Sequence, residues 1–176
     1  MVPQLSLSYN SQDRRDGSPV GYGWSLSTLS INRQNIGGLR TYFNDEYFTS
    51  GLSGELVRVA AGSGPNNFSA RTEDGSFIRY TFASNTWTAT TKNGTRYTFG
   101  ATDASRVFDF PNGAGVAAWF IDSIEDANGN QIHFSYFRDF NQLYLDTITY
   151  TDTASGTGPF LVSLIRELRP DADIYL

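Results

Sequence analysis

The chain contains no cysteine, and only one methionine and one histidine occur among its 176 residues. A protein without cysteine forms neither a disulfide framework nor a cysteine-ligated zinc site. A histidine-based metal site would need a second ligand of the same kind, and His133 is the only histidine. We therefore expect no metal and no cofactor, while the redox state of the surroundings stays open.

Positive charge is also scarce. Lys and Arg together number 13 against 18 Asp and Glu, which gives a formal net charge of -5. The basic pair Arg14 and Arg15 stands between Asp13 and Asp16, so its charge is neutralised locally. Nucleic-acid binding needs clustered Lys and Arg for phosphate contacts, and we expect no nucleic-acid partner.

Long apolar runs are missing as well. No segment approaches the roughly 20 apolar residues that a membrane-spanning helix needs, so we expect no membrane insertion by this segment. The N-terminus has no basic stretch followed by an apolar core, as a signal peptide would have. We expect export by another route, residence inside the cell, or a chain that is part of a longer one.

The residues that are abundant are typical of β-sheet. The chain contains 13 Phe, 10 Tyr and 17 Gly, together with much Thr and Ser. Aromatic residues and Thr favour a pleated, half-buried surface, and Gly serves the turns. Apolar and polar residues alternate with a period of two in several segments, which predicts strands with one buried face. These segments are 5–10, 78–82, 96–99, 131–136 and 147–150.

Short turns separate the expected strands. Asp74-Gly75, Asn93-Gly94 and Asn128-Gly129 are dipeptides that accept positive φ, as tight hairpin turns require. The stretches EDGSFIRYTF, KNGTRYTF and ANGNQIHFSYF repeat one hairpin pattern at uneven spacing. We predict an all-β fold of about ten to twelve strands, an antiparallel hairpin meander in a curved or two-layered sheet. Residues 44–49 form at most one helical turn.

No group of residues predicts catalysis or metal binding. Asp126, Asn128 and Asn130 begin like a calcium loop, but glycine stands at position 4 instead of 6, and position 12 is Phe137. An Asx-rich hairpin turn is the favoured interpretation. His133 lies on the polar face of a predicted strand, and the chain has no G-x-S-x-G nucleophile motif beside which it could act.

Three carboxylates, Asp122, Glu125 and Asp126, cluster where a strand leads into a turn. A glycoside hydrolase needs two carboxylates that face each other across a cleft, and sequence spacing does not place these three in that way. A hydrolase is therefore the least favoured of three functional hypotheses, and we expect no enzyme.

The segment GYGW at residues 21–24 could hold a ligand or turn a corner of the sheet. It lacks the phosphate-loop pattern, and no helix follows to present its N-terminus to an anion. We therefore expect Gly21 and Gly23 to turn the chain sharply at positive φ, and Trp24 to anchor the corner in the sheet. Aromatic side chains of this kind could also stack on sugars, although in sheets they more often form the core.

The opening stretch PQLSLSYNSQDRRDGSPVGYGWSLSTLSINR resembles the signature of the SpvB-like family. This family includes the B component of insecticidal toxin complexes and neighbours the Rhs and YD-repeat proteins. The segment Arg15-Asp16-Gly17 stands where the family has Gly-Asn-Gly, which is a change within a turn. The matching positions are Pro3, Leu5, Leu7, Tyr9, Ser11, Gly21, Gly23, Trp24, Ile31 and Arg33.

The resemblance continues along nearly the whole chain. The stretches YFNDEYFTSGLSGELVRV and WTATTKNGTRYTFG are similar to two hairpin segments of the family, and ELRPD is similar to a late Arg-Pro-Asp. The run AAWFIDSIEDANGNQIHFSYF resembles a family hairpin in which Asp126, Gly129 and Asn130 fall on motif positions, with Phe134 where Tyr is usual. Each piece alone is a weak signal, and the combination is specific.

The resemblance implies a role without chemistry. In that family this region builds the wall of a hollow β-shell that encloses a toxic C-terminal segment, and enzymatic activity belongs to a separate C-terminal domain. Residues 1–176 are thus expected to be a single SpvB-like domain, a fragment or shortened relative of a much larger chain. The implied partners are the remainder of its own β-shell, the enclosed toxin polypeptide and a pore-forming translocator. The implied location is extracellular, as part of a secreted bacterial toxin, with a cytoplasmic stage before release.

A binding module of another class is the alternative. A self-contained β-sandwich that recognises a glycan or a cell-surface protein through its aromatic residues would be a soluble monomer with saturable binding. A panel cut from a shell would instead leave strand edges and an apolar face uncovered.

Overall fold

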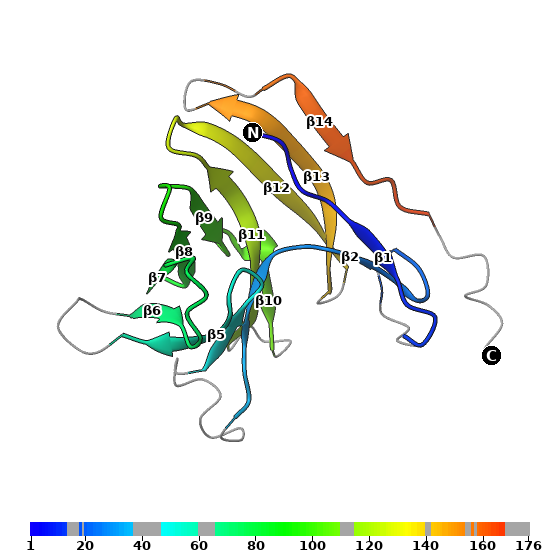
Figure 1. The fold of residues 1–176 in the computed structure, drawn as a ribbon. Coiled ribbons are helices and arrows are strands. Elements are labelled where there is room, and N and C mark those ends of the chain that lie inside the picture. Colours follow the sequence, from blue (N-terminus) through cyan, green and yellow to red (C-terminus); the bar gives the residue numbers. More distant parts are fainter. Residues whose placement is uncertain are drawn as a thin grey trace.

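The computed structural model describes residues 1–13, 18, 20–36, 47–59, 66–109, 115–139, 142–153, 156 and 158–167. Over these residues the fold is all-β and antiparallel, as predicted, with fourteen strands and a short 3₁₀ turn, η1 (Figure 1). The elements are β1 (Leu7–Tyr9), β2 (Trp24–Leu26), β3 (Ser30–Arg33), β4 (Phe48–Ser50), β5 (Gly54–Arg58), β6 (Asn67–Ala70), β7 (Arg79–Ala83), β8 (Thr86–Thr90), β9 (Arg96–Phe99), η1 (Asp103–Ser105), β10 (Arg106–Phe108), β11 (Val116–Glu125), β12 (Asn130–Asp139), β13 (Gln142–Thr153) and β14 (Phe160–Ser163).

Local structure differs from the sequence expectation within residues 44–49. The helical turn allowed for residues 44–49 is not formed at Phe48 and Thr49, because both belong to β4, and residues 44–46 lie outside the described part. Within the described ranges, no helix is long and apolar enough to cross a membrane. The turn around Arg14 and Arg15 also lies outside the described residues.

Twelve strands form one sheet, and β1 and β2 form a separate hairpin. Strands β3 to β9 follow one another in the sheet, and β11 pairs with both β3 and β9. These eight strands therefore close into a barrel-like ring, from which β12, β13 and β14 extend as an open sheet (Figure 1). The predicted curvature and meander are confirmed, and the closure through β11 is a long-range pairing that local patterns do not contain.

Strand β11 belongs to both the ring and the open sheet because each of its edges carries two partners. In its first half, Trp119 pairs with Arg106 of β10 on one edge and with Ile31 of β3 on the other. In its second half, Ser123 pairs with Thr98 of β9 and with His133 of β12. The ring and the open sheet thus diverge along a single continuous strand.

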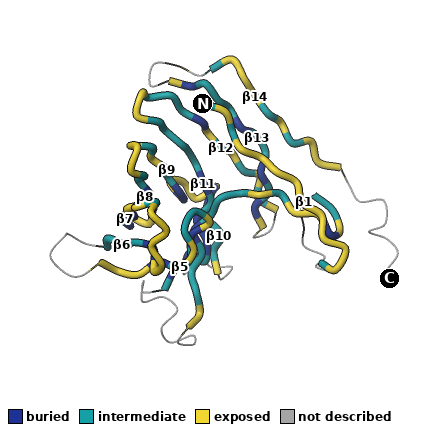
Figure 2. Tube along the Cα trace, viewed as in Figure 1, coloured by how far each residue is buried: buried dark blue, intermediate teal, exposed yellow. Residues whose placement is uncertain are grey.

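The core of the ring is aromatic. In β8 the side chains of Trp87 and Ala89 are buried, while the three Thr residues between and beside them are only half-buried, which is the period of two of a strand with one buried face. Phe48 contacts Trp87 and Trp119, with ring centroids 4.7 and 5.8 Å apart. Fully burying a side chain of the size of Phe contributes roughly 1.5–3 kcal/mol. Figure 2 marks buried positions along the strands of the ring in dark blue.

Gly100 allows Trp119 to complete this core. Gly100 has a φ of +62°, and a Cβ at this position would lie 2.2 Å from Trp119 Cδ1. Trp119 Nε1 donates hydrogen bonds to the backbone oxygen of Asn85 at 3.0 Å and to its Oδ1 at 3.1 Å. The indole therefore joins β11 to the turn between β7 and β8, and glycine leaves the room for it.

Two of the three predicted glycine turns have the same construction. In the turn of residues 91–95, Thr91 N donates to Thr95 O and Gly94 N donates to Thr91 O. In the turn of residues 126–130, Asp126 N donates to Asn130 O and Gly129 N donates to Asp126 O. The φ angles of Gly94 and Gly129 are +85° and +81°, as the hairpin signal requires. The first turn joins β8 to β9, which pairs with β11, and the second turn joins β11 to β12.

The third glycine turn and one unpredicted turn differ from this pattern. Gly75 also has positive φ, at +89°, but it lies in a longer loop between β6 and β7. Strands β7 and β8 are joined by Ser84 and Asn85, whose φ angles of +50° and +61° are those of a tight two-residue hairpin. The sequence signal there is weak because neither residue is glycine.

Candidate interaction surface

The β1–β2 hairpin has one apolar and one polar face. Leu7 pairs with Leu26 and Tyr9 pairs with Trp24 across the two strands. On the opposite face, serine hydroxyls are hydrogen-bonded across the strands, at 2.9 Å between Ser6 and Ser27 and 2.7 Å between Ser8 and Ser25. The hairpin is therefore held together by its polar face, while much of its apolar face is exposed; the exposed side chains are Leu5, Leu7, Tyr9 and Trp24.

The two glycines of this hairpin adopt conformations that favour glycine. Gly21 and Gly23 have φ angles of +107° and +74°. A Cβ on Gly23 would lie 2.9 Å from Tyr9 Cε2 and 3.0 Å from the backbone oxygen of Asn10. The backbone of Gly23 also accepts a 2.8 Å hydrogen bond from Asn10 N, so strand and turn pack closely at this point.

Trp24 is placed differently from the sequence expectation. We expected it to anchor the corner in the main sheet, but it lies in β2 of the separate hairpin and its side chain is 43% exposed. Its indole packs against Tyr9 with a centroid distance of 5.1 Å. Trp87 and Trp119 occupy the core instead. The difference arises because Trp24 lies in the separate hairpin, outside the aromatic core of the ring.

The open sheet of β12, β13 and β14 repeats this division into two faces. A second core cluster lies on one face, around buried Ile132, Leu145 and Ile148, with Met1 and Leu26 of the N-terminal segment packed against it. The other face carries hydroxyl and amide groups, such as Ser135, whose Oγ is hydrogen-bonded to Thr147. The N-terminal segment thus covers part of the apolar face and leaves the rest uncovered.

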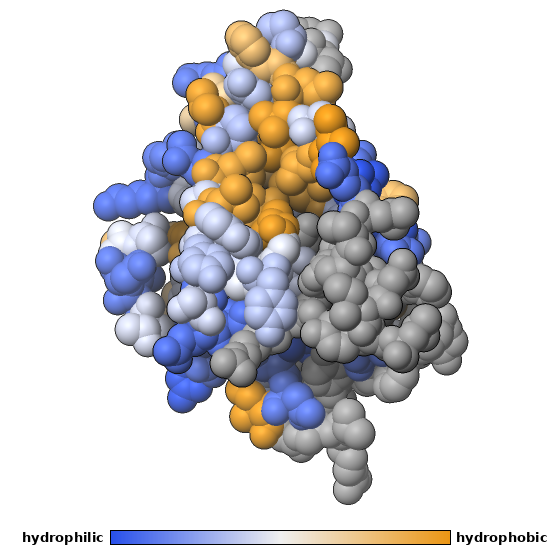
Figure 3. Space-filling model, turned by 90° about the vertical axis from the view of Figure 1, so that its right-hand side faces the viewer, coloured by the Kyte–Doolittle hydropathy of each residue, from blue (hydrophilic) through white to orange (hydrophobic). Residues whose placement is uncertain are grey.

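Strand β14 ends the sheet with apolar residues. It pairs with β13 on one side, through Ile148 opposite Val162 and Tyr150 opposite Phe160, and no strand of the described part pairs with its other edge. Phe160 and Leu161 are both exposed, so apolar side chains flank the free edge on both faces. Viewed from the side of β14, the molecule presents a continuous apolar area (Figure 3). We call the exposed residues Leu5, Leu7, Tyr9, Trp24 and Phe160, with the free edge of β14, the apolar surface.

The motif residues Asp126, Gly129 and Asn130 form a turn and do not form a cation site. Asp126 Oδ1 accepts hydrogen bonds from the backbone N of Asn128 and Asn130, both at 2.9 Å, and its Oδ2 accepts one from Asn130 Nδ2 at 2.7 Å. The side-chain bond from Asn130 is the largest of the effects that lower the pKa of Asp126. In the described ranges no cluster of three His, Asp or Glu side chains could hold a metal.

The other carboxylates named in the sequence do not face each other across a cleft. Asp122 is half-buried, which raises its pKa, and its Oδ2 accepts a 2.6 Å hydrogen bond from Ala101 N. Glu125 forms an ion pair with Arg96 at 2.8 Å, and the guanidinium hydrogen bond lowers the pKa of that carboxylate. Both groups hold neighbouring strands together and are not arranged as an acid–base pair.

His133 lies beside a buried carboxylate that sequence reasoning missed. Its Nε2 is 3.8 Å from Oδ2 of Asp152 and 3.1 Å from Oε1 of Gln131. Burial raises the pKa of Asp152, but hydrogen bonds from the Thr149 hydroxyl and from the backbone N of Gly158 outweigh it and lower the pKa overall. Asp152 therefore fixes the link between β13 and β14, and its only sequence signal was a position before a Gly- and Ser-rich loop.

The family comparison covers most of the chain. A model of the family described as "Salmonella virulence plasmid 65kDa B protein", SpvB, matches residues 1–84 and 78–155. Mono(ADP-ribosyl)transferase SpvB of Salmonella typhimurium is 24% identical over 207 aligned positions, which cover 99% of this chain and 34% of that protein. The relative from Salmonella dublin gives the same values. The chain thus spans about a third of the length of these curated relatives.

Solved structures agree with this relationship. The N-terminal domain of effector protein SpvB from Salmonella typhimurium strain LT2 has a TM-score of 0.70 and 25% identity, covering 85% of this chain and 59% of that domain. The TcdB2-TccC3 structure has a TM-score of 0.72 and 20% identity, covering 89% of this chain and 9% of that one. The Photorhabdus luminescens Tc holotoxin pore has a TM-score of 0.71 and 19% identity, covering 97% and 9%. Because the family match spans most of the chain, this protein belongs to the SpvB family.

Proposed function

We propose that this chain is a non-catalytic structural module of a bacterial secreted toxin, and that it contributes to a β-shell enclosing a toxic C-terminal segment. The observation that carries the proposal is the apolar surface, with its free strand edge at β14. A sheet edge with exposed apolar side chains is normally protected in a self-contained protein. Its exposure here indicates that further polypeptide covers it.

The relatives support the same assignment. One matched structure is the N-terminal domain of an effector, and another is a Tc holotoxin pore in which the matched region covers 9% of a long chain. The partners in this proposal are the remainder of the chain's own β-shell, the enclosed toxin polypeptide and a pore-forming translocator. Secretion as part of the toxin, after a cytoplasmic stage, belongs to the same proposal.

The proposal gives this segment no catalytic role. In the described residues, each of the candidate acidic groups is engaged in a turn, an ion pair or a strand link. The alternative of a self-contained β-sandwich fits less well, because the main sheet closes on itself in a ring and still leaves β14 at an edge.

The test uses the native polypeptide at its full length. Leu161→Lys places a charge on the edge strand, which should disfavour strand addition to β14. We expect limited proteolysis to cleave the enclosed C-terminal segment in this variant and to spare it in the unmodified protein. Val59→Lys is the matched control, because Val59 is exposed and lies outside the apolar surface. Cleavage of the C-terminal segment in the unmodified protein would contradict the shell role, and equal protection in all three proteins would contradict the part that the edge of β14 plays in it.

A further inference from the structure

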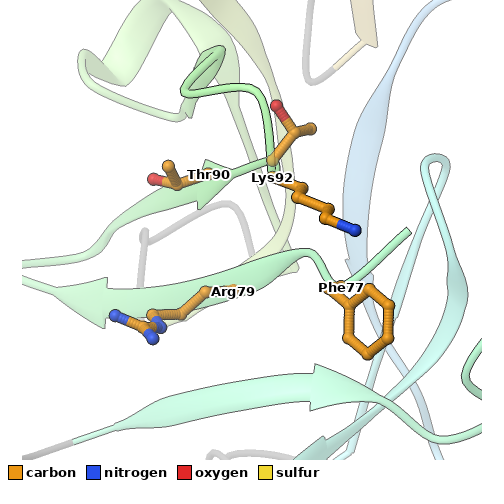
Figure 4. A pocket seen from close by; sticks show the side chains of 5 residues that line it. Phe77, Arg79, Thr90 and Lys92 are labelled. Atoms are coloured by element: carbon orange, nitrogen blue, oxygen red, sulfur yellow. The ribbon is translucent and has the colours of Figure 1, made fainter. Parts of the chain in front are cut away.

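A small hollow lies on the outer wall of the ring, where β7 begins and β8 ends (Figure 4). Its volume is about 340 Å³, it opens to solvent, and it is lined by Phe77, Arg79, Thr90, Thr91 and Lys92. Arg79 and Thr90 are cross-strand partners that alternate with buried residues, so their side chains face outward. Sites for small ligands have volumes of roughly 300–1,000 Å³.

Phe77 is held in an uncommon conformation at this hollow. Its φ is +50°, which bulky residues rarely adopt, and its side chain is 61% exposed. The carboxylate of Glu73 accepts hydrogen bonds from Gly75 N at 2.7 Å and from Phe77 N at 3.1 Å, and Asp74 Oδ1 accepts one from Ser76 N at 3.0 Å. The loop therefore presents an aromatic ring to solvent in a fixed place, as functional sites often do.

The hollow also contains two cations without carboxylate partners. Four arginines elsewhere form ion pairs with acidic side chains: Arg71, Arg96, Arg106 and Arg166. In the part of the chain that is described, Arg79 and Lys92 form no such pair. Lys92 extends toward the ring of Phe77, with Nζ 5.4 Å from its centroid (Figure 4). In a chain with a net charge of -5, this arrangement favours an anionic ligand.

We propose that this hollow binds a carboxylated sugar unit. The exposed ring of Phe77 offers an apolar face to the C–H side of a pyranose, and the Lys92 ammonium beside that ring suits its carboxylate. Thr90 also lines the hollow, opposite Arg79 on the neighbouring strand. The Thr91 hydroxyl is already bonded within its turn and contributes only to the wall.

The shape of the hollow favours a sugar over a peptide. It has a single aromatic ring and is open to solvent, so it would leave the apolar side chains of a peptide largely uncovered. The site uses no residue of the apolar surface, and it lies on the ring instead of the open sheet. This inference therefore stands apart from the proposed shell function, and each can fail without the other.

The experiment is an NMR titration of the full chain with the methyl glycosides of glucuronic acid and of glucose. These two sugars differ only in the carboxylate at C6. We expect the glucuronide to bind at least tenfold more tightly and to shift the backbone amides of Phe77 and Lys92. Phe77→Gly removes the ring and accepts positive φ, so it should weaken binding at least fivefold without lowering the melting temperature. Lys92→Gln should weaken binding to a similar extent.

Arg71→Gln is the matched control, because it removes a positive charge that is paired with Glu55 outside the hollow. Its affinity for the glucuronide should stay within twofold of the unmodified chain. Equal binding of glucoside and glucuronide, or unchanged affinity in Phe77→Gly and Lys92→Gln, would overturn the proposal. Displacement of the sugar by tetraglutamate at lower concentration would assign the hollow to acidic peptides and would overturn the assignment to a sugar.

Discussion

The variant Gly100→Ala tests whether the close contact between Gly100 and Trp119 stabilises the closed ring. A methyl group at this position would lie 2.2 Å from Trp119 Cδ1, and the Trp119 side chain is fully buried. An alanine held at a φ of +62° costs about 1–2 kcal/mol for its backbone conformation alone. The indole must also move away from Asn85, and the two hydrogen bonds to that residue contribute roughly 0.5–1.5 kcal/mol each.

The expected loss of stability for Gly100→Ala is therefore about 2–5 kcal/mol. For a chain of this length, that corresponds to a fall in melting temperature of roughly 10 °C. Urea unfolding followed by tryptophan fluorescence measures the free energy of unfolding directly. A loss of this size is a large share of the total stability of about 5–15 kcal/mol that is usual for a domain.

Gly129→Ala is the matched control for this prediction. Gly129 has a φ of +81°, and a Cβ there would meet nothing within 4 Å. It should lose only the conformational part, about 1–2 kcal/mol. If both variants lost the same free energy, the contact with Trp119 would not be rigid and the reasoning about ring closure would be refuted.

Three further predictions concern single side chains. Trp87→Ala should cost about 3–5 kcal/mol, because Trp87 is fully buried. Trp24→Ala should cost under about 1 kcal/mol, because Trp24 is exposed and packs against Tyr9 in the hairpin; urea unfolding compares the two variants. Burial raises the pKa of Asp122, so the unmodified chain loses stability as pH rises from about 3.9 and this carboxyl becomes ionised in the fold. The stability of Asp122→Asn relative to the unmodified chain should therefore rise over the same pH range. A difference that does not change with pH would contradict this. The pKa of Asp126 is lowered, so its contribution to the stability of the fold is present above about pH 3.9 and is lost as pH falls through the lowered pKa. Asp126→Ala should therefore lower the melting temperature at pH 7 and lower it much less near pH 2.

Sequence periodicity predicted strands such as β7 and β9 of the ring but not the closure of the ring. The alternation in residues 78–82 and the glycine signals at Gly94 and Gly129 are local, and local hydrogen bonds and burial decide them. The pairing of β3 with β11 joins Ser30 to Phe120, which are 90 residues apart, and no local pattern specifies such a partner. Trp119 is buried because this long-range pairing places β11 in the ring, whereas Trp24 is exposed in the hairpin outside the ring.

The missed residues share a physical reason. Asp152 is polar and buried, and its burial depends on hydrogen bonds from Thr149 and from Gly158 beyond the end of the strand. Phe77 has the sequence appearance of a strand residue, but the carboxylate of Glu73 holds its backbone out of the strand. In both cases a side chain bonds the backbone of a nearby loop, and that competition is not visible in the alternation of apolar and polar residues.

The long interval between β3 and β11 has a consequence for synthesis on the ribosome. Phe120 emerges 90 residues after its partner Ser30, which at usual rates of translation means roughly 5–20 s. During that interval β3 and β9 both lack the strand that joins them, because β11 pairs with each of them. Both strands therefore present unpaired edges to other polypeptides until β11 has emerged.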